Sequence, residues 1–320
     1  MKGSAAVVSP VVAPSDVRAA GSAREVSPRA WTRQQTRTAD FLTLTKPRLN
    51  FLVLITTLAG MYIAAPDGIA LSILVHALVG TALVAGGASA LNQVWEGETD
   101  GLMRRTRLRP IPSQRLRVSD GAWFGTALSA AGLIELTWKV NPLASAVAAA
   151  TLVSYVFVYT PLKKRTPLAT LVGAVPGALP PVIGWAAATG TISIPAVVLF
   201  GIVFLWQMPH FLAIAWMYRD DYERAGIPLL PVLEPDGRRT GQQALLYAAA
   251  LWPVSLLPAV IHIADAPYII VATFLGFGLI ALSALFARER TTKTARNLFL
   301  YSIIYLPLIW TALVVDRLWL

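Results

Sequence analysis

Nine apolar segments of membrane-spanning length follow one another along most of the chain. We place them at about 49–65, 69–93, 119–137, 142–160, 168–189, 194–218, 241–262, 267–287 and 297–316. Each residue advances a helix by about 1.5 Å, so about 20 apolar residues cross the hydrocarbon core. With 56% hydrophobic and 14% charged residues, the chain is predicted to be an all-α, polytopic membrane protein. Residues 41–320 form its single transmembrane domain.

The basic residues indicate how these spans are oriented. All Lys and Arg residues except Lys139 and Arg317 lie in the N-terminal segment or in the loops after every second span. Loops rich in Lys and Arg face the cytoplasm. This distribution explains the formal charge of +10 without a nucleic-acid partner. It predicts a multi-pass protein of the cell inner membrane with a cytoplasmic N-terminus, with the mitochondrial inner membrane as the alternative.

Residues 1–40 precede the first span and are rich in Ala, Val, Ser and Pro. Such a composition cannot bury a core, so we predict a disordered cytoplasmic tail. Its Arg-rich second half also fits an organellar transit peptide. The chain contains no cysteine, which excludes disulfides, thiolate nucleophiles and Cys-ligated metals.

The most informative polar stretch follows the second span. Asn92, Glu96 and Asp100 are spaced by four residues, so a helix would place them within about 80° of one face. Arg105 and Arg109 follow. Oxygen ligands suit Mg²⁺, and guanidinium groups suit phosphate oxygens. The stretch therefore predicts a site for a diphosphate carried with Mg²⁺. The alternative is a solvated loop that obeys the charge rule for cytoplasmic segments.

A second acidic cluster follows the sixth span. Asp221 comes eleven residues after His210, which is about 20° apart on a helical wheel. We therefore expect both side chains to face one cavity. Asp220 points elsewhere and has Arg224 four residues later, so a local ion pair is expected there. Two carboxylate-bearing helix ends could thus converge on metal ions that bridge a diphosphate.

Other polar residues lie within or beside the spans. Gln207 and His210 interrupt the apolar sixth span, where polar residues are candidates for function. Histidine is a common ligand of haem iron, and a hydrogen bond between helices is the alternative. Lys163 and Lys164 close the fourth span on the basic side. They suit either a diphosphate or an anionic lipid.

These motifs resemble those of a known family. N-x-x-x-[D/E]-x-x-x-D followed by M-x-R-T-x-x-R-P, at 92–100 and 103–110, resembles the first signature of the UbiA-type intramembrane prenyltransferases. W-Q-x-P-H-F at 206–211 and D-Y-x-x-A-G-I-P-x-L-P-V at 221–232 resemble the branch that farnesylates haem b. The resemblance extends from Thr45 to the end of the sequence.

The resemblance implies nine transmembrane helices around a central cavity. It implies transfer of the farnesyl group of farnesyl diphosphate to a vinyl group of haem b with addition of water, giving haem O, the precursor of haem A. Mg²⁺ is the implied cofactor, haem b is a substrate, and haem A synthase or terminal-oxidase assembly factors are implied partners in the bilayer. The residues that it implies are Asn92, Glu96, Asp100 and Asp221 for catalysis and Mg²⁺, Arg105, Arg109, Lys163 and Lys164 for diphosphate, and Trp206, Gln207, His210 and Tyr218 for haem.

Two positions depart from the family's pattern. Glu96 stands where Asp is usual and keeps the charge. The second motif usually has two acids four residues apart, whereas Arg224 and Ala225 follow Asp220 and Asp221 at that spacing. Asp221 would therefore bind metal alone or through water. A sibling enzyme acting on an aromatic or chlorin ring shares the first motif and is an alternative, as is a non-enzymatic carrier. Charges gathered at one membrane face argue against the carrier, whose site would lie at mid-membrane.

Overall fold

A computed structural model describes residues 36–65 and 67–317, and within these ranges the chain forms helices and no strands. The elements in chain order are α1 (Arg37–Leu44), α2 (Pro47–Ala64), α3 (Leu71–Trp95), α4 (Gly97–Leu102), α5 (Val118–Lys139), α6 (Pro142–Val153), the π-helical η2 (Ser154–Tyr159), α7 (Thr160–Leu162), α8 (Ala169–Ala178), α9 (Pro180–Thr189), α10 (Ile194–Met217), α11 (Arg219–Arg224), α12 (Leu230–Leu233), α13 (Arg238–Val260), α14 (Ala266–Glu289) and α15 (Thr292–Arg317).

The helices confirm the predicted fold class. Eight stretches of the described chain are long and apolar enough to cross a membrane, and they coincide with eight of the nine predicted spans. One of them runs through α6, η2 and α7, and another joins α8 to α9. The remaining predicted span, 119–137, is α5, which has 22 residues and packs along α3. Asp120, Glu135 and Lys139 make α5 less apolar than the others.

The described chain begins inside the segment predicted as a tail. Residues 1–35 lie outside the described residues, and 37–40 form the first turn of α1. An ion pair of 2.9 Å joins Arg37 to Asp120 at the start of α5. Arg115 Nε donates to buried Asp40 at 3.0 Å. The end of this segment is therefore helical, and its contacts hold α1 to the basic loop before α5.

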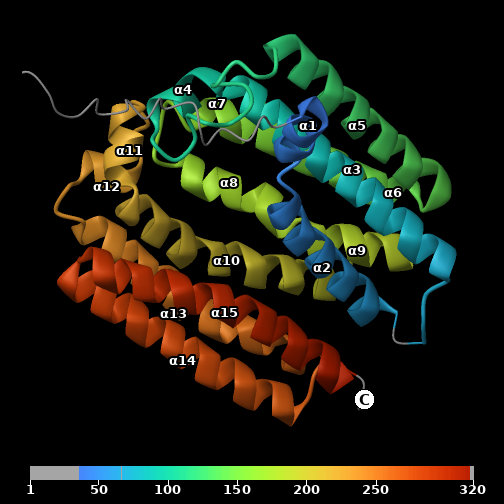
Figure 1. Cartoon of the computed structure of the whole chain (residues 1–320). Coiled ribbons are helices and arrows are strands. Elements are labelled where there is room, and N and C mark those ends of the chain that lie inside the picture. Colours follow the sequence, from blue (N-terminus) through green and yellow to red (C-terminus); the bar gives the residue numbers. More distant parts are fainter. Residues whose placement is uncertain (1–35, 66, 318–320) are drawn as a thin grey trace, which may run out of the picture. The chain divides into compact units, whose positions relative to one another are not determined.

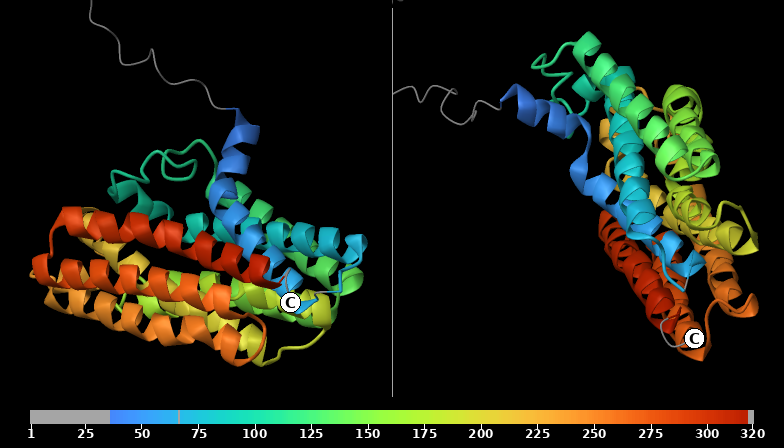
Figure 2. Two further views of the ribbon diagram at one scale, coloured as in Figure 1. Left: turned by 90° about the horizontal axis from the view of Figure 1, so that it is seen from below. Right: turned by 90° about the vertical axis from the view of Figure 1, so that its right-hand side faces the viewer.

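The helices pack in two groups that meet along α10, α2 and α15. In the first group α2 contacts α3 and α9, α3 contacts α5, and α5 contacts α6 (Figure 1). In the second group α13 contacts α14, and α14 contacts α15; Figure 2 shows the last two side by side. Because α10 touches α8, α13 and α15, and α15 touches α2, the two groups share one packed interior.

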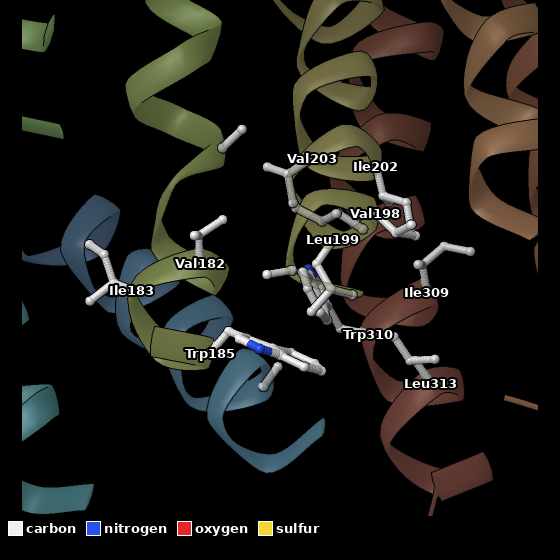
Figure 3. Close-up of a cluster of buried hydrophobic side chains, with 14 of the residues drawn as sticks. Val182, Ile183, Trp185, Val198, Leu199, Ile202, Val203, Ile309, Trp310 and Leu313 are labelled. Atoms are coloured by element: carbon white, nitrogen blue, oxygen red, sulfur yellow. The ribbon is translucent and has the colours of Figure 1, made fainter. Parts of the chain in front are cut away.

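The two ends of the bundle differ. At one end lie the short helices α4, α7, α11 and α12, at the upper left of Figure 1. Toward the other end, buried apolar side chains fill the space between α9, α10 and α15 (Figure 3). They include Trp185, Leu199, Ile202 and Trp310, each no more than 7% exposed. Both acidic motifs, which lead into or lie on α4 and α11, are thus at the end with the short helices.

Glycines allow α3 and α5 to approach closely. A Cβ atom at Gly87 would lie 2.6 Å from the carbonyl oxygen of Gly125, and one at Gly132 would lie 2.6 Å from that of Gly80. Small residues at such contacts let helix backbones pack in a membrane. This contact matters for the site because α3 carries Asn92 and leads directly into Glu96.

Gly87→Ala is expected to destabilise the protein by about 1–3 kcal/mol, because the new methyl group must push α5 away from α3. The apparent melting temperature in detergent should fall. Gly201→Ala is the matched control, since the atom nearest to its Cβ would be a Val254 methyl carbon at 3.4 Å. Equal melting temperatures for the two variants would contradict the close contact.

Candidate functional site

The first motif spans the junction between α3 and α4. The amide of Glu96 donates to the carbonyl of Asn92 at 2.9 Å, and that of Asp100 donates to the carbonyl of Glu96 at 2.7 Å. The four-residue hydrogen-bond step therefore continues through the end of α3, and the three side chains occupy successive turns. All three residues are buried, with exposed fractions of 2%, 6% and 0%.

Both carboxylates of this motif are paired with cations. Lys163 Nζ lies 3.1 Å from Glu96 Oε1, and Arg109 lies 2.6 Å from Asp100 Oδ2. A buried carboxylate is costly unless it is paired in this way. Burial alone would raise the pKa of Glu96, but the ammonium groups of Lys163 and Lys46 outweigh it and hold that pKa below its ordinary value.

Lys46 adds a third cation that the motifs did not predict. Its Nζ donates to Asn92 Oδ1 at 3.1 Å, and Asn92 Nδ2 donates to Thr160 Oγ1 at 3.0 Å. The backbone of Lys46 is left-handed, with φ 49°, a conformation that costs about 1–2 kcal/mol for a residue with a side chain. Burial, followed by repulsion from Arg109, lowers the pKa of Lys46 to about 8. The sequence feature that could have indicated Lys46 is its position before Pro47, on the basic side of the first span. No feature of the sequence indicates Thr160 as part of the site.

One oxygen of Asp100 is left without a partner. Arg109 holds Oδ2, whereas Oδ1 is buried and accepts no hydrogen bond from the described residues. Buried polar atoms are normally satisfied, so such an atom indicates an ion or a water. Within the described residues no three or more His, Cys, Asp and Glu side chains are grouped to hold a metal. Mg²⁺ commonly binds one or two carboxylates plus waters and phosphates, and Asn92, Glu96 and Asp100 fit that mode.

The second acidic cluster pairs differently from the prediction. Arg224, expected beside Asp220, makes its ion pair with Asp221. Asp220 pairs instead with Arg219, at 3.5 Å, and is exposed. Asp220 therefore makes a local ion pair, as predicted, but with Arg219 instead of Arg224. The carboxylate proposed for metal binding is the one that Arg224 holds.

Aromatic residues join the second cluster to the first. Arg105 donates to the hydroxyl of Tyr222 at 3.4 Å, and its guanidinium lies 5.1 Å from the ring centre of Tyr218. Lys163 Nζ lies 5.8 Å from the ring centre of Tyr222. The structure therefore brings together Arg105 and Lys163, which were predicted for diphosphate, and Tyr218, which was predicted for haem. Lys164 is exposed, and it is Lys163 that reaches Glu96.

The polar residues of α10 point in two directions. His210 Nδ1 lies 2.8 Å from Ser302 Oγ on α15, and Trp206 Nε1 donates to the carbonyl of Ser302 at 2.7 Å. The rings of Trp206 and His210 stack with centres 5.1 Å apart. Gln207 is buried and donates to the carbonyl of Ala174 on α8 at 3.2 Å. The predicted haem-binding group is thus divided, and both His210 and Gln207 make the hydrogen bond between helices that was their alternative.

His210 and Asp221 do not share the helical face that the wheel predicts. The chain leaves the helical conformation at Tyr218, where φ is −113° and ψ is 21°, and α11 starts afresh. A helical wheel applies only to a continuous helix, so the angle does not carry over the break. His210 accordingly contacts α15, whereas Asp221 pairs with Arg224 on its own short helix.

Comparisons with known proteins identify the family of the sequence. The sequence model of the UbiA prenyltransferase family matches residues 53–305. A curated protein of Solibacter usitatus (strain Ellin6076), named protoheme IX farnesyltransferase, is 46% identical over 287 residues, which are 87% of this chain and 98% of that protein. A protein of the same name from Myxococcus xanthus (strain DK1622) is 44% identical over 280 residues, covering 87% of this chain and 95% of its own.

Solved structures share the fold at low sequence identity. A structure concerning digeranylgeranylglyceryl phosphate synthase has a TM-score of 0.76 and 18% identity, covering 89% of this chain and 99% of that one. A UbiA homologue from Archaeoglobus fulgidus bound to GPP and Mg²⁺ has a TM-score of 0.62 and 15% identity, covering 86% of this chain and 99% of that one.

Lys163→Met is expected to destabilise the metal-free protein by about 3 kcal/mol, because it leaves the buried carboxylate of Glu96 short of a partner. Adding Glu96→Gln removes that charge and should restore most of the loss. Apparent melting temperatures of the two single variants and the double variant, measured in detergent with chelator, test this coupling. Additive losses would contradict it.

Proposed function

The chain belongs to the UbiA prenyltransferase family, and we propose that it transfers the farnesyl group of farnesyl diphosphate to a vinyl group of haem b. Water is added in the reaction, and the products are haem O and diphosphate. The observation that carries this proposal is the identity of 46% to a protoheme IX farnesyltransferase over 98% of that protein's length. The motif residues of the buried site supply carboxylates that suit Mg²⁺ and cations that suit a diphosphate.

The metal-binding part of the proposal concerns the first motif. Asn92, Glu96 and Asp100 would hold Mg²⁺, and the unpartnered Oδ1 of Asp100 supports this choice. When bound, Mg²⁺ neutralises the negative charge that develops on the departing diphosphate. Arg224 holds Oδ1 of Asp221, so Asp221 would bind the metal through its other oxygen or through water, and we assign it a secondary role.

The cations of the site act on the diphosphate. Arg109 and Lys163 pair with Asp100 and Glu96, and Lys46 donates to the neutral Asn92 beside them. Three cations thus accompany two carboxylates, which leaves an excess of positive charge for a polyanion. Their N–H groups would donate to oxygens whose charge grows as the bond to the farnesyl carbon breaks. Arg105, held against Tyr218 and Tyr222, and the exposed Lys164 are proposed as further donors.

The apolar interior would protect the allylic cation that remains. The aliphatic side chains packed between α9, α10 and α15, such as Leu199, Ile202 and Ile309, would offer it no nucleophile, and their packing would suppress early capture by water. The haem vinyl group then adds to the cation, and water closes the reaction. Trp206 and His210 on α10 and Tyr218 at its end are proposed to contact the haem, and the inward-facing Gln207 is proposed to support them. The proposed protein partners are haem A synthase or oxidase assembly factors.

Asp100→Asn is expected to lower conversion of haem b by about 10²–10³-fold, because it removes a charged ligand of the Mg²⁺ that would neutralise the departing diphosphate. Glu98→Gln is the matched control, since Glu98 lies two residues away but is exposed, and it should retain activity. Purified protein would receive Mg²⁺, labelled farnesyl diphosphate and either haem b or 4-hydroxybenzoate. Equal conversion by Asp100→Asn and wild type would refute the mechanism, and conversion of 4-hydroxybenzoate alone would favour a sibling enzyme.

The orientation in the cell inner membrane is also proposed. The basic loops that carry the site are assigned to the cytoplasm by their Lys and Arg content. Reporter enzymes fused after residue 165 and after residue 190 should be active on the cytoplasmic and the opposite side, respectively. The reverse pattern would contradict the assignment.

A further inference from the structure

Ser302 on α15 holds two aromatic residues of α10 at once. Its carbonyl accepts from Trp206 Nε1 at 2.7 Å, and its hydroxyl oxygen lies 2.8 Å from His210 Nδ1. The ring of Phe299, one turn earlier on α15, lies 5.0 Å from the imidazole centre. The histidine ring is therefore fixed on one edge by a hydrogen bond and on its faces by aromatic rings.

The hydroxyl of Ser302 determines where the histidine carries its proton. Ser302 Oγ also lies 2.6 Å from the carbonyl oxygen of Phe299, which can only accept. When the single hydroxyl hydrogen is donated to this carbonyl, Oγ accepts at the contact with His210. The proton of a neutral imidazole thus lies on Nδ1, and Nε2 carries the lone pair.

Nε2 is the free edge of this ring. It has no hydrogen-bond partner among the described residues, and His210 is only half-buried. A nitrogen with a lone pair can bind a metal or accept a hydrogen bond, but it cannot donate one to an anionic carboxylate. The lone pair on Nε2 therefore favours the haem iron over a haem propionate as its partner, because iron accepts an electron pair and a propionate does not.

We propose that Ser302 is a positioning residue that fixes His210 in the Nδ1–H form, so that Nε2 binds the iron of the haem substrate. This rests on the proposed function and specifies which part of haem b meets α10. A hydrogen bond to the remote ring nitrogen orients a ligating histidine, and its removal typically lowers metal affinity about 10–100-fold. Trp206, held by the same residue, would contact the macrocycle beside the iron.

The test uses full-length protein in detergent, titrated with haem b in the absence of farnesyl diphosphate. Wild type should show the absorption spectrum of histidine-ligated haem and, after reduction, an iron–histidine stretching band. His210→Ala should lose both. Ser302→Ala should bind haem about 10-fold more weakly and shift the band, whereas Ser302→Thr keeps the hydroxyl and should stay within about twofold of wild type. Ser283→Ala, a buried serine of α14, should change nothing.

The outcomes of these measurements separate the role of Ser302 from the proposed function. A wild-type protein that binds haem without the iron–histidine band, or a Ser302→Ala variant with unchanged affinity and band, would overturn the role of Ser302. The wild-type spectrum by itself tests whether His210 binds the iron. If Ser302→Ala does not fold, Ser302→Cys, which keeps the size of the side chain and hydrogen-bonds only weakly, should weaken haem binding and shift the band in the same way; unchanged affinity and band would overturn the role of Ser302. Turnover of haem b by the same wild-type preparation tests the proposed function separately. Activity without the band rejects only this inference, whereas absence of turnover rejects the function.

Discussion

The structure depends on the cost of burying two carboxylates. Glu96 and Asp100 are almost fully enclosed, and each is stable there only because a cation arrives from another part of the chain. Lys163 comes from the loop after α7 and Arg109 from the loop before α5, while Lys46 joins from the start of α2. These contacts hold three segments of the chain at one end of the bundle. Three cations beside two carboxylates leave a net positive charge that suits an anionic ligand.

This arrangement links the folding of the chain to its chemistry. The groups that neutralise the carboxylates are those proposed to bind the diphosphate. A metal that takes over the carboxylate oxygens would free Lys163 and Arg109 for phosphate without moving them far. Tyr222 lies against Arg105 and Lys163, so the second motif contributes an aromatic wall to the same place. Its acid remains paired with Arg224.

Local patterns in the sequence were sufficient for the spans and for the first motif. The apolar segments predicted the positions of the long helices. The four-residue spacing also predicted that Asn92, Glu96 and Asp100 lie on successive turns, and this holds beyond the end of α3 because the backbone hydrogen bonds continue at that spacing. Contacts between distant segments were not accessible in this way, since Lys46 lies 46 residues from Asn92 and Ser302 lies 92 from His210. The helical-wheel angle between His210 and Asp221 does not apply in the structure, because Tyr218 between them leaves the helical conformation.

The packed end of the bundle has a consequence for the membrane as a whole. Trp185, Leu199 and Trp310 close the interior between α9, α10 and α15 with dry side chains. An ion entering such a region would lose its hydration without compensation. The apolar packing between α9, α10 and α15 therefore opposes the passage of ions. In the inner membrane proposed for this chain, the same packing would keep the charged site from becoming a leak for protons.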